Sequence, residues 1–117
     1  MKRDLDLIRD ILFSVEGAPA GSTISGFDFP DHDQMEISEH VQLLLDDGYI
    51  EGKVLRPHGI YAVTRLTARG HDFLDNARNS TVWKQVLHEA KEKGMSTSMT
   101  ILNKLLEGAL KKYAGIE

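Results

Sequence analysis

The 117-residue sequence contains no cysteine, and this absence removes several kinds of chemistry at once. Without thiols the chain can form no disulfide, no thiolate nucleophile and no thiolate zinc site. It also has no apolar run long enough to span a bilayer, and no uncharged apolar stretch near the start that would act as a secretory signal. We therefore expect a cytoplasmic protein that does not associate with a membrane.

Catalytic motifs are absent as well. No serine lies in a nucleophile motif, and Gly17, Gly21 and Gly26 are too scattered to form a phosphate-binding loop. His32 and His40 are eight residues apart, which is not the i, i+4 spacing of two histidine ligands on a helix. The sequence therefore predicts a protein that is not an enzyme and that holds no metal and no small-molecule cofactor.

Basic residues are scarce in the first half of the chain. Residues 1–52 contain three basic and twelve acidic side chains, a net charge of −9, whereas residues 53–117 contain eleven basic and six acidic ones, a net of +5. Three interpretations remain open: a basic binding face, an acidic surface that faces a partner, or halves that neutralise each other within the fold or across a dimer.

Hydrophobic periodicity and turn residues predict an α+β fold. The expected elements are a helix over 2–16, a short strand over 22–29, a helix over 33–47, a hairpin of strands 49–55 and 60–66, a helix from 67, and helices over 81–93 and from Ser96 or Ser98 to about 113. This order predicts a winged-helix domain over residues 1–79, in which the hairpin is the wing. A C-terminal helical hairpin over 80–117 would follow and either pack back or dimerise.

Three residues mark the ends of these helices, and a fourth indicates a close contact. Asp33, three residues before Glu36, is expected to cap the helix over 33–47, and Gly48 to end it in the left-handed conformation. Thr67 is expected to cap the next helix. Gly70 lies early in that helix, where glycine costs about 1 kcal/mol relative to alanine. Its presence indicates that another backbone passes close by.

Several long motifs resemble one family over most of the chain. They are MKRDLDLIRDIL at the start, EHVQLLLDDGYIEG, RLTARGHDFLDNARN, the pair Trp83-Lys84, and KEKGMSTSMTILNKLL with KKYAGIE at the end. The sequence resembles the small bacterial and phage proteins catalogued as domain of unknown function 2513, an uncharacterised family similar to winged-helix proteins. The resemblance carries over no catalytic residue. It favours a role in regulation or in interference with a host.

The sequence departs from a complete helix-turn-helix. Between Phe29 and Asp33 there is no room for the positioning helix that precedes a recognition helix. The recognition-helix equivalent over 33–47 contains five acidic residues and no lysine or arginine, so a DNA duplex would repel it. We interpret this helix as a solvated acidic face.

The leading hypothesis is a DNA-binding transcription regulator that contacts DNA through its wing. Its candidate nucleic-acid-binding residues are Lys53, Arg56, His58, Arg65 and Arg69. These charges could instead protect a strand edge from aggregation or neutralise the acidic helix.

The alternative hypothesis is a phage or mobile-element module that binds a host protein through its acidic first half. Its candidate partner-binding residues are Glu36, Glu39, Asp46 and Asp47. We also expect a homodimer, because symmetric pairs are the commonest oligomers and the last helix has a wide apolar stripe. The candidate dimerisation residues are Leu102, Leu105, Leu106, Ala109 and Tyr113. The same stripe could instead form part of the chain's own core.

Overall fold

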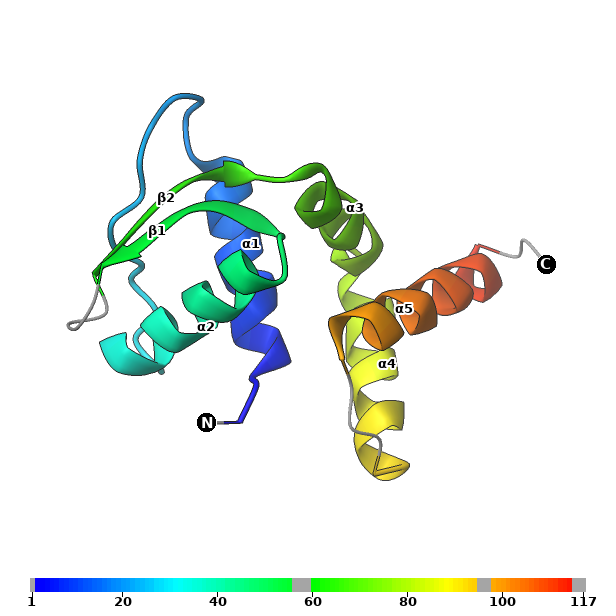
Figure 1. The fold of residues 1–117 in the computed structure, drawn as a ribbon. Helices are drawn as coiled ribbons and strands as arrows, with labels where there is room; N and C mark the ends of the chain where they lie inside the picture. Colours follow the sequence, from blue (N-terminus) through cyan, green and yellow to red (C-terminus); the bar gives the residue numbers. More distant parts are fainter. Residues whose placement is uncertain (1, 56–59, 95–97, 115–117) are drawn as a thin grey trace. The chain divides into compact units, whose positions relative to one another are not determined.

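The fold was analysed in a computed structural model that describes residues 2–55, 60–94 and 98–114. These residues form an α+β structure of five helices and one two-stranded antiparallel sheet (Figure 1). The elements are α1 (Leu5–Gly17), α2 (Gln34–Asp46), β1 (Ile50–Leu55), β2 (Ile60–Leu66), α3 (Ala68–Ala77), α4 (Ser80–Glu92) and α5 (Met99–Tyr113). The chain divides into two compact units, 1–71 and 72–117. The division lies inside α3, whereas the sequence placed a domain boundary after residue 79.

Side-chain caps fix where the first two helices begin. The Asp4 carboxylate accepts a hydrogen bond from the Leu7 N–H at 3.1 Å, so α1 starts after Asp4. The expectation of a helix from residue 2, with Asp4 inside its first turn, was therefore wrong. Asp33 caps α2 as predicted, because its carboxylate accepts from the Glu36 N–H at 2.7 Å.

The hairpin follows α2 directly. Gly48 has a φ of 76°, the left-handed conformation that was predicted for it, and the chain then enters β1. β1 and β2 pair from Ile50 opposite Leu66 to Leu55 opposite Ile60, with a register shift between Glu51 and Gly52. Ile50, Tyr61, Val63 and Leu66 are buried, so one face of the hairpin belongs to the core of the first unit.

The predicted strand over residues 22–29 is reduced to a single bridge. Ile24 exchanges two backbone hydrogen bonds of 2.8 Å with Val63, on the edge of β2 that does not pair with β1. The Phe27 N–H then donates to the Tyr61 hydroxyl at 3.1 Å, so a side chain takes the hydrogen bond that a longer ladder would need. The sequence expectation was correct about the location of this segment and wrong about its length.

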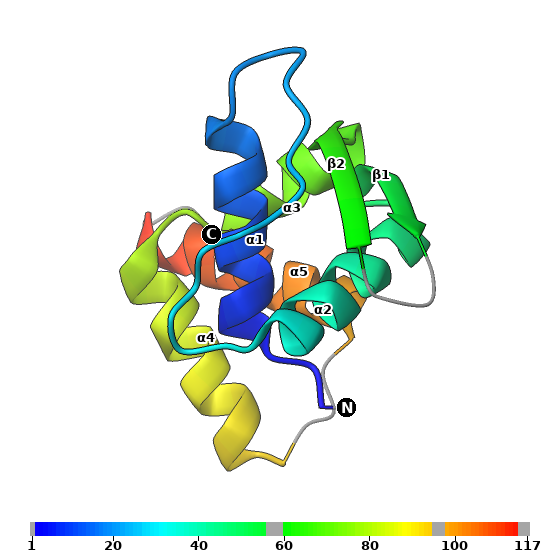
Figure 2. The ribbon, with the colours of Figure 1, turned by 90° about the vertical axis from the view of Figure 1, so that its left-hand side faces the viewer.

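A loop without helix connects α1 to α2. Residues 18–33 are all described, and none of them is helical. The loop leaves the end of α1, passes beside β2 and returns to the start of α2 (Figures 1 and 2). The predicted absence of a positioning helix is therefore confirmed for this segment.

Gly70 lies against another backbone, as the sequence indicated. A Cβ atom at this position would overlap the carbonyl oxygen of Tyr49. The same carbonyl accepts a hydrogen bond of 3.1 Å from the Thr67 N–H. The Thr67 hydroxyl donates to the Gly48 carbonyl and accepts from the Gly70 N–H, so Thr67 is the predicted cap of α3.

The second unit contains the end of α3 together with α4 and α5. Phe73 and Trp83 meet edge to face, with ring centroids 6.4 Å apart. The Asn76 side-chain amide donates to the Asn103 side-chain oxygen at 2.7 Å, which ties α3 to α5. Ser98 caps α5, one of the two caps that were predicted, and Ser96 lies outside the described residues. Among the described residues, no helix is long and apolar enough to cross a membrane.

Candidate functional site

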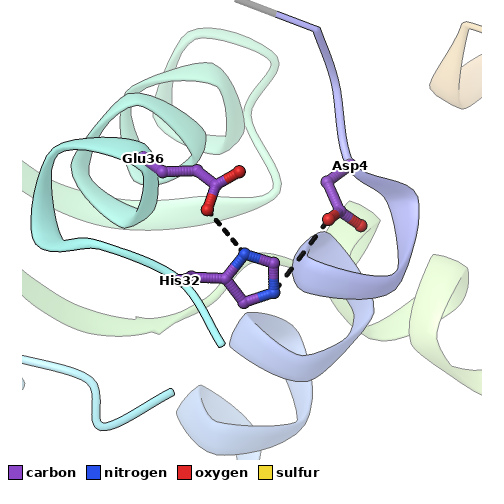
Figure 3. A group of neighbouring side chains, drawn as sticks. All are labelled: Asp4, His32 and Glu36. Atoms are coloured by element: carbon purple, nitrogen blue, oxygen red, sulfur yellow. Dashed lines mark hydrogen bonds and ion pairs between the residues drawn. The ribbon is translucent and has the colours of Figure 1, made fainter. Parts of the chain in front are cut away.

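Three side chains from separate parts of the first unit converge at the start of α2 (Figure 3). Asp4 is the cap of α1, His32 lies in the loop before α2, and Glu36 is in the first turn of α2. His32 Nδ1 is 2.6 Å from Glu36 Oε1, and His32 Nε2 is 4.0 Å from Asp4 Oδ2. Among the described residues, this is the one group of three metal-binding side chains whose ligand atoms lie within 4.8 Å of one another.

His40, a fully buried residue of α2, holds in place the backbone that bears this cluster. Its Nε2 accepts a hydrogen bond of 2.9 Å from the Asp4 N–H, and its Nδ1 lies 2.8 Å from the Glu36 carbonyl oxygen. Because a backbone N–H can only donate and a carbonyl can only accept, His40 is the neutral tautomer with its proton on Nδ1. His40 therefore joins α1 to α2 at the residues that bear two of the clustered carboxylates.

The pKa values of His32 and of the neighbouring Asp10 are both raised. The hydrogen bond to Glu36 raises the pKa of His32 above its usual value, and the charges of Glu36, Asp4 and Asp31 act in the same direction. Burial opposes this shift. Burial also raises the pKa of the neighbouring Asp10 carboxyl, against the effect of Arg9. An imidazole held between carboxylates can retain a proton or bind a cation in its place.

Sequence reasoning missed this cluster, although part of its signal was visible. His32 and Glu36 have the i, i+4 spacing that brings two side chains to one side of a helical turn. The prediction that no metal is bound rested on the spacing of His32 and His40, so it overlooked this pair and the more distant Asp4.

The predicted nucleic-acid-binding residues that the structure describes differ in their surroundings. Arg65 donates two hydrogen bonds to the Glu51 carboxylate, at 2.9 and 2.7 Å, so its charge is matched on the hairpin itself. The Arg69 guanidinium lies 4.7 Å from the centroid of the Tyr49 ring. Lys53 is exposed on β1. Arg56 and His58 lie outside the described residues.

Two large apolar side chains are exposed on the hairpin. Leu55 and Ile60 pair across the strands at the end of the ladder, and they are 59% and 55% exposed. The sequence had assigned no role to this pair. Exposed apolar side chains next to charged ones are a common feature of surfaces that bind other proteins.

The predicted partner-binding residues lie on α2 and at its end. Glu39, Asp46 and Asp47 are exposed, and Asp46 accepts a hydrogen bond of 2.8 Å from the Gln42 amide. Glu36 differs from the other three because it is half-buried and bound to His32. Its carboxylate belongs to the cluster as well as to the acidic face.

The predicted dimerisation residues divide by exposure. Leu102 and Leu106 are 0% exposed and belong to the core of the chain, so they are not available to a second copy in this structure. Leu105 and Ala109 are half-buried and Tyr113 is exposed. These three border a shallow groove between α4 and α5, together with Lys104 and other residues of both helices.

Comparison with known proteins places the chain in a family. The family described as "Hypothetical protein (DUF2513)" matches residues 2–96. A Haemophilus influenzae protein described as "Uncharacterized protein" is 32% identical over 111 residues, which cover 92% of this chain and 93% of that protein. A search of the solved structures found no match. The resemblance seen in the sequence motifs is therefore confirmed, and the chain belongs to the DUF2513 family.

Proposed function

We propose that this protein is a non-enzymatic, winged-helix-like module that binds a basic protein partner through the exposed acidic face of α2. One observation carries the proposal: α2, the helix that the winged-helix interpretation makes the recognition helix, contains no lysine or arginine and exposes Glu39 and Asp46. The missing positioning helix and the matched charge of Arg65 also argue against ordinary major-groove docking.

A basic partner follows from charge complementarity. Residues 1–71 contain seven basic and twelve acidic side chains, a net of −5, so the unit that contains α2 repels polyanions and attracts cationic surfaces. The first unit also exposes two large apolar side chains, Leu55 and Ile60, of the kind that contribute to protein interfaces.

Charge reversal at Glu39 tests the proposal. Purified protein would be used to capture partners from nuclease-treated bacterial lysate, and the recovered proteins would be identified. The variant Glu39→Lys is expected to lose a specific partner that the wild-type protein retains, because rim charges across an interface must be complementary. Glu89→Lys, which makes the same charge change at an exposed position of α4, should retain it.

Recovery of the same partner by wild type and Glu39→Lys would contradict the proposal. So would the recovery of nucleic acid alone from untreated lysate.

DNA binding through the hairpin is the second candidate. It is favoured by the exposed Lys53 on β1 and by Arg69, whose guanidinium is held at the Tyr49 ring. On this reading, duplex DNA at low salt would bind wild-type protein, Lys53→Glu would weaken binding, and Glu39→Lys would strengthen it. The two candidates therefore predict opposite effects of the same change at Glu39.

A further inference from the structure

We propose that Asp4 and His32 bind a divalent transition-metal ion, with Glu36 orienting the imidazole of His32. The observations that carry this inference are the meeting of Asp4 with the i, i+4 pair His32 and Glu36, and the hydrogen bonds that orient these side chains. It does not depend on the proposed partner binding, which is carried by the exposed Glu39 and Asp46 and not by Asp4 or His32.

The two ring nitrogens of His32 have separate partners. Nδ1 lies 2.6 Å from Glu36 Oε1, so in the neutral ring it carries the proton and donates to that carboxylate. The lone pair of Nε2 then faces Asp4. A metal-binding histidine commonly donates its other ring N–H to a carboxylate in this way, which fixes the tautomer and makes the ligand nitrogen more basic.

The gap between Nε2 and Asp4 suits a metal ion. These two atoms are 4.0 Å apart, which is too long for a hydrogen bond. Zinc–nitrogen and zinc–oxygen bonds are each about 2.0–2.2 Å long, so an ion can sit between the two atoms after a small adjustment. The Asp4 carboxylate is held in position because its Oδ1 accepts a hydrogen bond from the Leu7 N–H as the cap of α1. Its other oxygen, Oδ2, faces the His32 ring.

The supporting backbone is held in place by His40. This buried ring bonds the Asp4 N–H and lies against the Glu36 carbonyl oxygen, so two of the three residues are anchored to one rigid group. Both nitrogens of His40 are occupied by these contacts, and it is therefore a positioning residue and not a ligand.

The donor set selects the class of ion. One imidazole nitrogen and a carboxylate oxygen favour zinc and similar transition metals over magnesium and calcium, which prefer oxygen alone. Two protein ligands leave coordination positions open for water or for a group supplied by another molecule. His32 and Asp4 side chains are 20% and 36% exposed, so solvent can reach the ion.

The test is zinc titration of the full, untagged chain at pH 7 by calorimetry. The wild type is expected to bind one equivalent, Asp4→Asn and His32→Gln to lose binding, and Glu36→Gln to weaken it about tenfold. Asparagine still caps a helix, so Asp4→Asn removes the charge of the ligand while keeping α1. Circular dichroism would establish that each variant is folded.

The chain supplies a matched control. His88 and Glu92 form another i, i+4 pair, with 3.0 Å between Nε2 and Oε1, on the exposed surface of α4. The variant His88→Gln should bind zinc as the wild type does. The proposal is overturned if the wild type fails to bind at about 1 mM zinc. It is equally overturned if Asp4→Asn or His32→Gln binds as tightly as the wild type, or if His88→Gln removes the site.

Discussion

At the scale of single residues, His40 has the largest structural role among the histidines that the structure describes. It is 0% exposed, and its ring connects the first residue before α1 to the first turn of α2. Removing the ring takes the acceptor away from the part-buried Asp4 N–H, unties α1 from α2 at this point, and leaves a cavity.

We therefore expect His40→Ala to lower the free energy of unfolding by about 2–5 kcal/mol. Denaturant unfolding followed by circular dichroism would measure this loss. His71→Ala, at an exposed position, should change the free energy by less than about 0.5 kcal/mol. Equal effects of the two substitutions would show that His40 does not join the helices.

His32 predicts a dependence of stability on pH. Its pKa is raised in the folded protein, chiefly by the hydrogen bond to Glu36. The folded protein therefore binds this proton more tightly than the unfolded chain does. The stabilisation is fully present below the unfolded pKa of about 6.5 and is lost as the pH rises through the folded value.

Unfolding free energies of wild type and His32→Gln, measured with a chelator from pH 5.5 to 9, would test this dependence. The difference between the two proteins should be largest at pH 5.5 and should shrink towards pH 9. A difference that grows with pH would mean that the imidazole is neutral when it stabilises the fold.

Local chemistry made some residues predictable and left others hidden. Asp33, Gly48 and Thr67 act on neighbours within a few positions, so their caps could be predicted from the sequence. Asp4 and His32 meet only because α1 and the loop before α2 are brought together by the fold. No spacing pattern in the sequence predicts this contact.

At the scale of elements, α3 passes so close to the start of the hairpin that a side chain added at Gly70 would destabilise the protein. Gly70 has no room for a Cβ atom because the Tyr49 carbonyl oxygen occupies that space. Gly70→Ala should therefore destabilise the protein by about 1–3 kcal/mol, although alanine is the better helix former.

Gly108 in α5 provides the control for this substitution. A Cβ atom there would meet nothing within 4 Å, so Gly108→Ala should stabilise the protein by about 0.5–1 kcal/mol. Thermal or denaturant unfolding of both variants would give the two signs. Stabilisation by Gly70→Ala would show that α3 does not pass this close to Tyr49.

The elements themselves could be predicted where periodicity is strong. The apolar residues Ile8, Ile11, Leu12 and Val15 recur at helical spacing, and all four are buried on α1. The segment over 22–29 was harder, because its β-like composition does not say which backbone groups will find a strand partner. Here the Tyr61 hydroxyl takes the Phe27 N–H.

At the scale of the whole molecule, the charge follows the two units more closely than the two halves of the sequence. Residues 1–71 have a net charge of −5, and residues 72–117, with seven basic and six acidic side chains, have a net of +1. The +5 of residues 53–117 therefore arises largely from hairpin residues that belong to the acidic unit. One of these, Arg65, is matched by Glu51 within the same hairpin.

The bonds of Thr67 to Gly48 and Tyr49 close the hairpin at its base. These hydrogen bonds join the two ends of the segment between Gly48 and Thr67. Lengthening such a loop costs only about 0.6 kcal/mol for each doubling of its length. The hydrogen bonds of Thr67 therefore hold the start of α3 against the residues that follow α2, whatever the length of the segment that joins them.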